Sequence, residues 1–407
     1  MKKFNLSFKL ALISQVISLL GGNVLRVTLL LFILDFTMSA EVQGLATAIS
    51  AMPFVLFAIP GGIIADRMNR KKSIVALDAA KAAISAGLLI IFLNGAYTVP
   101  ILITFITVFA VLVTLFGPIL TSAIPTIVDE GVLVEANGMI QIINGASMLL
   151  AFPIAGFLYA TIGVSNIIIL CGISFLISTI IDLFIEIPFR KPKYKAGVGQ
   201  DVKESFRYMT KENPLLLKVA VMFAILSLLF VPIFGVAFPY IIRIEFGASD
   251  IMFGIAQGFA ALGMLAGSLL SGKVKKWLKV EYFSSWILGM SILCLFLGFA
   301  VYSPLFFGST FVPFWLFNVG MLLIMVIVAF GNIIVMANVQ EQAPAHLLGK
   351  VVALVLLIAN ITPPIGNYLF GWAMETLAER VFILFIVVAA TTFITALIGK
   401  KMFQNMK

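Results

Sequence analysis

One face of the first apolar segment carries a stripe of polar or small residues, formed by Gln15, Ser18, Gly22 and Arg26. Their spacing places all four on the same side of an α-helix, and Asn23 lies beside them. A guanidinium within an apolar segment is costly unless it contacts a partner, a ligand or water. The stripe therefore predicts a substrate or proton cavity in which Arg26 contacts a solute or a coupling carboxylate. A structural ion pair or a snorkelling side chain is the alternative.

Other charged residues lie in or beside apolar segments. Asp78 and Lys81 are three residues apart, so we expect a neutralising intramembrane pair, with gating or proton transfer as the alternative. Asp35 follows Arg26 by nine residues and points roughly the opposite way, near the predicted outer end. It is interpreted as an interfacial carboxylate, or else as a further member of the cavity. A third set steps by four residues and is interpreted as a helix-end charge ladder: Asp182, Glu186 and Arg190.

The composition indicates which elements must position these residues. Of the 407 residues, 62% are hydrophobic and only 11% are charged, far less charge than a water-soluble surface of this size requires. The apolar runs are continuous rather than alternating, which favours spanning helices over a β-barrel. Twelve segments are long enough to span a membrane: 10–35, 43–65, 73–93, 98–124, 138–161, 164–187, 215–242, 249–271, 282–302, 311–338, 350–374 and 380–399. The predicted fold is therefore an all-α membrane protein with twelve transmembrane helices.

The positive charges predict the orientation. If the N-terminus is cytoplasmic, all but four of the 27 Lys and Arg residues fall on inner segments. The exceptions are Arg26, Lys81, Arg243 and Arg380. We therefore expect a multi-pass protein of the cell inner (plasma) membrane with both termini in the cytoplasm. The net charge of +9 then reflects anchoring at the inner leaflet, and no nucleic-acid partner is expected.

Two stretches of the chain resemble each other at a separation of 211 residues. This shift aligns Gly138 with Gly349 and Pro153 with Pro364. The repeat predicts two six-helix halves around a central cavity, an arrangement typical of secondary transporters. We expect Pro153, Gly156, Pro364 and Gly366 to serve helix packing.

The repeat also predicts the domain organisation. The N-terminal half is expected over 1–187, a cytoplasmic linker over 188–214 and the C-terminal half over 215–407. Val202, Phe206 and Met209 recur at helical spacing among charges in the linker, which predicts a short interfacial helix there.

The sequence "GGIIADRMNRKK", residues 61–72, places small and charged residues where the second helix leaves the membrane. Gly62 allows close helix packing, and the carboxylate of Asp66 can meet the positive end of another helix. We expect an acidic loop on the same side to pair with these cations in one conformation and to release them in the other. The predicted gating residues are Gly62, Asp66, Arg67, Arg70, Lys71, Asp129 and Glu130.

The Gly-x-x-x-Asp-Arg-x-x-Arg-Lys pattern resembles the cytoplasmic loop signature of the major facilitator superfamily. Asn69 departs from it, where that family usually has Gly, but Asn tolerates left-handed backbone geometry. Together with "AIPTIVDEGVLVEANG", "FRYMTKENPLLLKV" and "VQEQAPAHLLGKVVAL", the chain looks like the macrolide-efflux-like branch. The resemblance implies a monomeric secondary active transporter that exports amphipathic drugs by alternating access, driven by protons. A siderophore exporter or a lysophospholipid flippase of the same fold is the alternative.

Two features bear on the mechanism that this resemblance implies. Antiporters of the family often carry Gly-x-x-x-Gly-Pro-x-x-Gly on the fifth helix, and here Met148 and Phe152 replace its first two glycines. The antiporter motif is therefore incomplete. The chain has one His and two Cys, which gives no metal-binding pattern, and no Gly-rich phosphate loop. We expect no enzyme activity, no metal and no cofactor.

Overall fold

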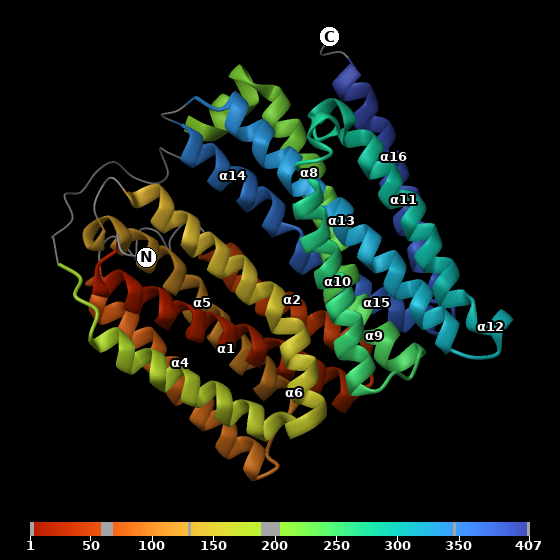
Figure 1. Ribbon diagram of the computed structural model, residues 1–407. Helices are drawn as coiled ribbons and strands as arrows, with labels where there is room; N and C mark the ends of the chain where they lie inside the picture. The colour runs from red at the N-terminus through yellow and green to blue at the C-terminus, as the bar shows by residue number, and fades with distance from the viewer. Residues whose placement is uncertain (1–3, 58–67, 129–131, 189–203, 345–346, 405–407) are drawn as a thin grey trace. The chain divides into compact units, whose positions relative to one another are not determined.

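The structure, a computed structural model, describes residues 4–57, 68–128, 132–188, 204–344 and 347–404 (Figure 1). These described residues form helices and contain no strand. Ten of their helical segments are long and apolar enough to cross a membrane. Among the predicted gating residues, Gly62, Asp66, Arg67, Asp129 and Glu130 lie outside the described residues.

The helices of the N-terminal part are α1 (Leu6–Thr37), α2 (Ala40–Leu56), α4 (Arg70–Leu93), α5 (Val99–Ile127) and α6 (Leu133–Leu183). The C-terminal part begins with η2 (Tyr208–Glu212) and a long segment composed of α8 (Pro214–Pro232), η3 (Ile233–Ala237), α9 (Phe238–Tyr240) and η4 (Ile241–Glu245). It continues with α10 (Asp250–Leu270), α11 (Val280–Tyr302), α12 (Pro304–Phe307), α13 (Phe311–Gln342), α14 (Leu348–Ile361), α15 (Pro363–Leu377) and α16 (Phe382–Gln404).

The long helix α6 accounts for two of the predicted spans. Gly163 interrupts it with φ +74° and ψ 167°, a conformation that glycine adopts without steric cost. This break lies between the predicted spans 138–161 and 164–187. Counting α6 as two spans and adding the shorter apolar helix α2 gives twelve, so the predicted all-α membrane fold is confirmed.

Proline explains a break that the sequence analysis did not predict. The expected span 350–374 consists of α14 and α15, which are separated at Thr362. Pro363 and Pro364 begin α15, and neither has a backbone N–H that could continue the hydrogen bonding of α14. The expected membrane span 350–374 is thus formed by two shorter helices.

The chain forms two compact units. One contains Met1–Phe36 and Ile49–Ala196, and the other contains Thr37–Ala48 and Gly197–Lys407. The beginning of α2 thus belongs to the second unit, because it packs on α15. Glu375 Oε2 accepts hydrogen bonds from the Ser39 hydroxyl (3.0 Å) and the Ala40 backbone N–H (2.9 Å). A carboxylate therefore lies at the positive end of α2.

The segment before α8 also packs within the second unit. Met209 is fully buried, and the Tyr208 hydroxyl donates to the Gln342 carbonyl oxygen at 2.9 Å. Lys350 Nζ lies 2.8 Å from Glu204 Oε2. Part of the predicted linker is thus helical and held by α13 and α14, while Phe206 stays exposed.

Glycine permits the close contact of α10 with α13. A methyl group on Gly263 would overlap the Leu322 carbonyl oxygen, and one on Gly267 would lie 2.7 Å from the Val326 carbonyl oxygen. Gly258, on the same helix, has nothing within 4 Å. The contact is a small-residue packing of the kind that membrane helices use.

We therefore expect Gly263→Ala and Gly267→Ala each to lower the free energy of unfolding by about 1–3 kcal/mol through overpacking. Gly258→Ala is the matched control and should be neutral or slightly stabilising, because alanine is the better helix former. Unfolding in detergent micelles measures the difference. Equal stability of all three variants would contradict the close packing of α10 on α13.

Candidate functional site

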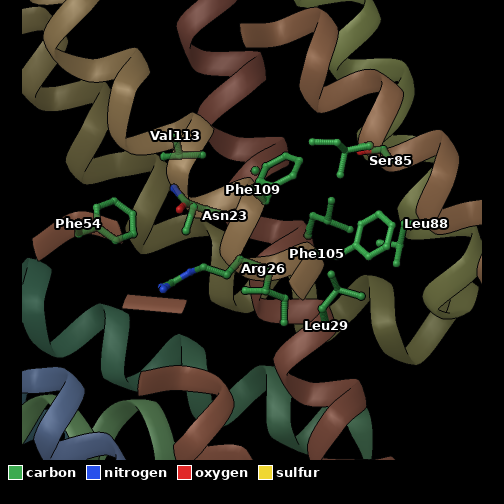
Figure 2. Close-up of a pocket in the computed structure, with 14 residues that line it drawn as sticks. Asn23, Arg26, Leu29, Phe54, Ser85, Leu88, Phe105, Phe109 and Val113 are labelled. Carbon is green, nitrogen blue, oxygen red and sulfur yellow. The ribbon is translucent and has the colours of Figure 1, made fainter. Parts of the chain in front are cut away.

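A pocket lies within the first unit, between α1, α2, α4 and α5 (Figure 2). It contains about 450 Å³ of space not filled by protein atoms. This figure includes space open to solvent, so it is an upper limit on the volume that a ligand could fill. Because the lining residues lie on membrane-spanning helices, a ligand here would be held within the membrane.

The polar end of the pocket is formed by α1. Figure 2 shows Asn23 and Arg26 together on the side of Phe54, which comes from α2. Arg26 is the only charged residue among those that line the pocket in the described part of the chain. Across those described residues its guanidinium makes no hydrogen bond or ion pair. Up to five N–H donors are therefore available to a ligand.

The opposite end of the pocket is apolar. Figure 2 shows Phe105 of α5 and Leu88 of α4 on the side away from Phe54, with Ser85 nearby. Gly22 completes the wall, and a methyl group there would lie 3.3 Å from the Phe109 ring. A ligand that fits must have an apolar body and one polar group with hydrogen-bond acceptors.

The other predicted cavity residues lie elsewhere. Gln15 is buried, and its Nε2 donates to Asn144 Oδ1 of α6 at 2.9 Å. Asp35 accepts a hydrogen bond of 2.8 Å from the Tyr159 hydroxyl. Neither residue lines the pocket, so the structure brings together only Asn23 and Arg26 of the four predicted cavity residues.

Asp78 and Lys81 of α4 form a fully buried ion pair. Lys81 Nζ lies 2.7 Å from Asp78 Oδ1 and donates to the Ser18 hydroxyl at 2.9 Å. The Ser18 hydroxyl in turn donates to Asp78 Oδ1 at 2.8 Å. The ammonium also lies 4.4 Å from the centre of the Phe116 ring, a cation–π distance. Ser18, a member of the polar stripe, thus serves this pair rather than the pocket.

The pair extends to α6 through residues that the sequence analysis did not place there. The Ser178 hydroxyl donates to Asp78 Oδ2 and lies 2.7 Å from the Ser14 hydroxyl. Ser14 donates to Asp182 Oδ1 at 2.5 Å. We call Ser14, Ser18, Asp78, Lys81, Ser178 and Asp182 the buried charge cluster; all six are at most 1% exposed.

The predicted helix-end charge ladder that begins at Asp182 is wrong. α6 ends at Leu183, so Glu186 is not on the next turn of the helix and is exposed, whereas Asp182 turns into the protein core. The sequence gives one indication of these contacts between helices, which is a spacing of four residues. It separates Ser14 from Ser18 and also Ser178 from Asp182. It shows which residues share a face but not that the two faces meet.

The described residues of the predicted gating loop lie at the beginning of a helix, and one residue of the predicted packing set lies at a contact between helices. Arg70 and Lys71 begin α4, and Asn69 caps it with φ −69°, accepting from the Lys72 N–H at 3.2 Å. Asn69 is therefore an extended capping residue and does not use the left-handed geometry that asparagine tolerates. Gly366 is buried against α8, where a methyl group would overlap the Leu228 carbonyl oxygen.

The prolines and the remaining glycine of the predicted packing set lie within helices. Pro153 is inside α6 and Gly156, one turn later, is buried. Pro364 is buried in the first turn of α15. These positions are compatible with helix packing.

Comparison with known proteins places this architecture among membrane transporters. A sequence profile described as Major Facilitator Superfamily matches residues 11–367. Macrolide efflux protein A of Streptococcus pyogenes is 24% identical over 374 residues, which cover 90% of this chain and 89% of that protein. An uncharacterized MFS-type transporter of Bacillus subtilis (strain 168), YkuC, is 27% identical over 290 residues, covering 67% of this chain and 66% of that protein.

A solved structure shows the same fold at low sequence identity. The crystal structure of a D-xylose-proton symporter matches with a TM-score of 0.73, covering 97% of each chain at 15% identity. The fold around the Arg26 pocket is therefore one that other membrane transporters share.

Proposed function

The chain belongs to the major facilitator superfamily, and from that membership we propose that it exports amphipathic small molecules across the cell membrane by alternating access. The observation that carries this proposal is a pocket with Arg26 at one end and aromatic side chains at the other; among the described residues the Arg26 guanidinium has no hydrogen-bond or ion-pair partner. The similarity to macrolide efflux protein A supports drug-like compounds as substrates. A proton gradient is the proposed energy source.

The pocket favours some substrates over others. An apolar body fits against Phe105, Phe109 and Leu88, while Arg26 and Asn23 bind carbonyl, hydroxyl or anionic oxygens. The fixed positive charge of Arg26 disfavours a cationic group at this end. We therefore propose substrates whose group at Arg26 is neutral and rich in oxygen, or anionic.

The proposed orientation in the membrane follows from the distribution of Lys and Arg residues. We propose a multi-pass protein of the plasma membrane, with both termini in the cytoplasm and with halves at 1–187 and 215–407 that alternate as a monomer. The inner position of most Lys and Arg residues supports this orientation.

Binding to the purified protein tests the proposal. A radiolabelled macrolide should bind the wild-type protein in detergent and be displaced by unlabelled macrolide. It should also be taken up in exchange by proteoliposomes that contain the protein. The control liposomes contain the heat-denatured protein. Absence of both binding and exchange by the folded protein would contradict a macrolide-type substrate.

A lysophospholipid flippase is the second candidate, because the Arg26 guanidinium beside an apolar wall also suits a phosphate headgroup and an acyl chain. Competition separates the two. Displacement of the macrolide by oxygen-rich neutral drugs, but not by lysophosphatidylglycerol, would favour drug export. The reverse order of potency would favour the lipid.

The contact between the beginning of α2 and α15 is proposed to open and close during transport. Glu375 holds the first residues of α2 through Ser39 and Ala40. A carboxylate at an exposed helix N-terminus contributes about 0.3–1 kcal/mol. Glu375→Ala should therefore raise the population of the open contact about two- to fivefold, since 1.4 kcal/mol is about a factor of ten.

Thiol labelling measures this opening. Gln43 is 1% exposed, so a cysteine at this position should react slowly with an impermeant maleimide, and faster when Glu375→Ala is added. The native cysteines are both buried and give a low background. Thr376→Ala is the control, because within the described residues its hydroxyl bonds only to the Trp372 carbonyl oxygen of its own helix. An unchanged labelling rate in the Glu375→Ala protein would exclude a gating role for this contact.

A further inference from the structure

The two carboxylates of the buried charge cluster are connected by a chain of hydroxyl groups. Along this chain the contacts run from Asp182 Oδ1 to Ser14 Oγ (2.5 Å), from Ser14 Oγ to Ser178 Oγ (2.7 Å), and from Ser178 Oγ to Asp78 Oδ2. All three are short enough to be hydrogen bonds, so each requires one proton between its two oxygens.

The number of protons does not match the number of contacts when both carboxylates are ionised. Ser14 and Ser178 each supply one hydroxyl proton, and an ionised carboxylate supplies none. The Ser18 hydroxyl and the Lys81 ammonium cannot fill the gap, because they bind Asp78 Oδ1 and each other. Two protons are thus shared among three contacts. One additional proton on Asp182 or Asp78 completes the chain.

The charges lead to the same conclusion. In the described part of the chain the titratable groups of the cluster are Asp78 and Lys81 from α4 and Asp182 from α6. Helix α1 contributes only the hydroxyls of Ser14 and Ser18, and α5 contributes the Phe116 ring. Lys81 neutralises one carboxylate, so a second ionised carboxylate would leave a net negative charge in a site with no solvent exposure. One bound proton makes the cluster neutral.

The second oxygen of Asp182 also favours the protonated, neutral form of this carboxyl group. Its Oδ2 is buried and has no hydrogen-bond partner among the described residues. A buried carboxylate oxygen without a donor is costly when ionised, and much less so when the group is a neutral acid. The unpartnered oxygen is an observation independent of the proton count.

We propose that the buried charge cluster binds one exchangeable proton, shared by Asp182 and Asp78, and that this is the proton coupled to transport. Protonated Asp182 gives its proton to Ser14 Oγ, Ser14 gives its own to Ser178, and Ser178 gives its own to Asp78 Oδ2. The transfer breaks three O–H bonds and forms three, and it moves one positive charge from α6 to α4. The coupling part of this inference rests on the proposed function, whereas proton binding itself does not.

The cluster lies next to the Arg26 pocket along two helices. Ser18 precedes the pocket residue Gly22 by one turn of α1, and Lys81 precedes the pocket residue Ser85 by one turn of α4. The Ser85 hydroxyl donates to the Lys81 carbonyl oxygen at 2.8 Å. A change in the charge of Asp78 therefore acts directly on helices that line the pocket, which gives the proton a route to affect substrate binding.

Infrared spectroscopy of the purified protein tests proton binding without any substrate. A protonated carboxylic acid in an apolar site has a C=O stretching band that is separate from the carboxylate bands. The wild-type protein should show this band at neutral pH, and Asp182→Asn should remove it. Glu186→Gln is the matched control, because it makes the same change at an exposed carboxyl group four residues further along the chain. The band should persist in this control.

Folding of the variants is checked by thermal unfolding before the spectra are compared, and Asp78→Asn provides a second variant of the pair. The inference would be overturned if the C=O stretching band persisted in both folded variants. It would also be overturned if the wild-type protein lacked this band at every pH at which it stays folded. Loss of the band in either variant, but not in the control, would support it.

Transport provides the second readout. In proteoliposomes with an imposed pH gradient, Asp182→Asn should lose gradient-driven accumulation while retaining macrolide exchange, which needs no net proton movement. Loss of the infrared band together with unchanged gradient-driven transport would refute coupling at this site. A wild-type protein that shows the band but transports no macrolide would instead contradict the proposed substrate and leave proton binding supported.

Discussion

Replacement of Lys81 with methionine should lower the free energy of unfolding by about 3–5 kcal/mol, the range measured when one partner of a buried ion pair is removed. Lys81 and Asp78 are both fully buried, and the ammonium is the only cation in the buried charge cluster. Methionine can keep the contact with Phe116 but leaves Asp78 without its counter-ion. The measurement is unfolding in mixed micelles, monitored by helical circular dichroism.

The double variant Lys81→Met with Asp78→Asn is the control for this prediction. It removes both charges and should recover most of the lost stability, because a neutral pair does not leave an unpaired charge in the membrane. The defect of Lys81→Met alone should also shrink as pH falls, since protonation of the carboxyl groups removes the unpaired charge. A single variant as stable as the wild-type protein at neutral pH would show that the pair is not structurally required.

Replacement of Arg26 with glutamine should weaken macrolide binding by about 10- to 100-fold. Hydrogen bonds to charged groups contribute about 1.5–3 kcal/mol, and 1.4 kcal/mol corresponds to about a factor of ten. Since Arg26 makes no hydrogen bond or ion pair with the described residues, the substitution should not reduce stability. The loss should therefore appear in the dissociation constant, measured by equilibrium binding, and not in the unfolding temperature.

Arg207→Gln is the control for Arg26, because it makes the same chemical change at an exposed residue outside the pocket. Arg26→Lys should give an intermediate affinity, since lysine keeps the charge but lacks the planar set of donors. Unchanged affinity of a folded Arg26→Gln protein would remove Arg26 from the proposed substrate site.

The spans and the pocket-lining part of the polar stripe could be predicted from sequence because both depend on local periodicity. Continuous apolar runs gave the helices, and helical spacing placed Asn23 and Arg26 on the same part of α1. Periodicity did not show that Gln15 faces Asn144 or that Asp35 pairs with Tyr159. Those contacts join residues separated by more than 120 positions.

Local periodicity predicted only part of the buried charge cluster. The i, i+3 spacing of Asp78 and Lys81 predicted their pairing, since one helix holds both residues. The contacts of Ser14 with Ser178 and Asp182 cross 164 and 168 residues of sequence. They depend on how the last part of α6 packs against α1, which no local pattern specifies. The same applies to the beginning of α2, whose contacts with α15 follow from tertiary packing.

Accumulation of a substrate in living cells tests the proposed gradient-driven export of amphipathic molecules. A labelled macrolide would be followed in a bacterial host that lacks its own efflux pumps, with and without this protein, and with and without an uncoupler. We expect lower accumulation in cells that contain the protein, and we expect this difference to disappear when the uncoupler is added. Equal accumulation in both cells, with the protein folded in the membrane, would contradict macrolide export, and lower accumulation that persists with the uncoupler would contradict proton coupling.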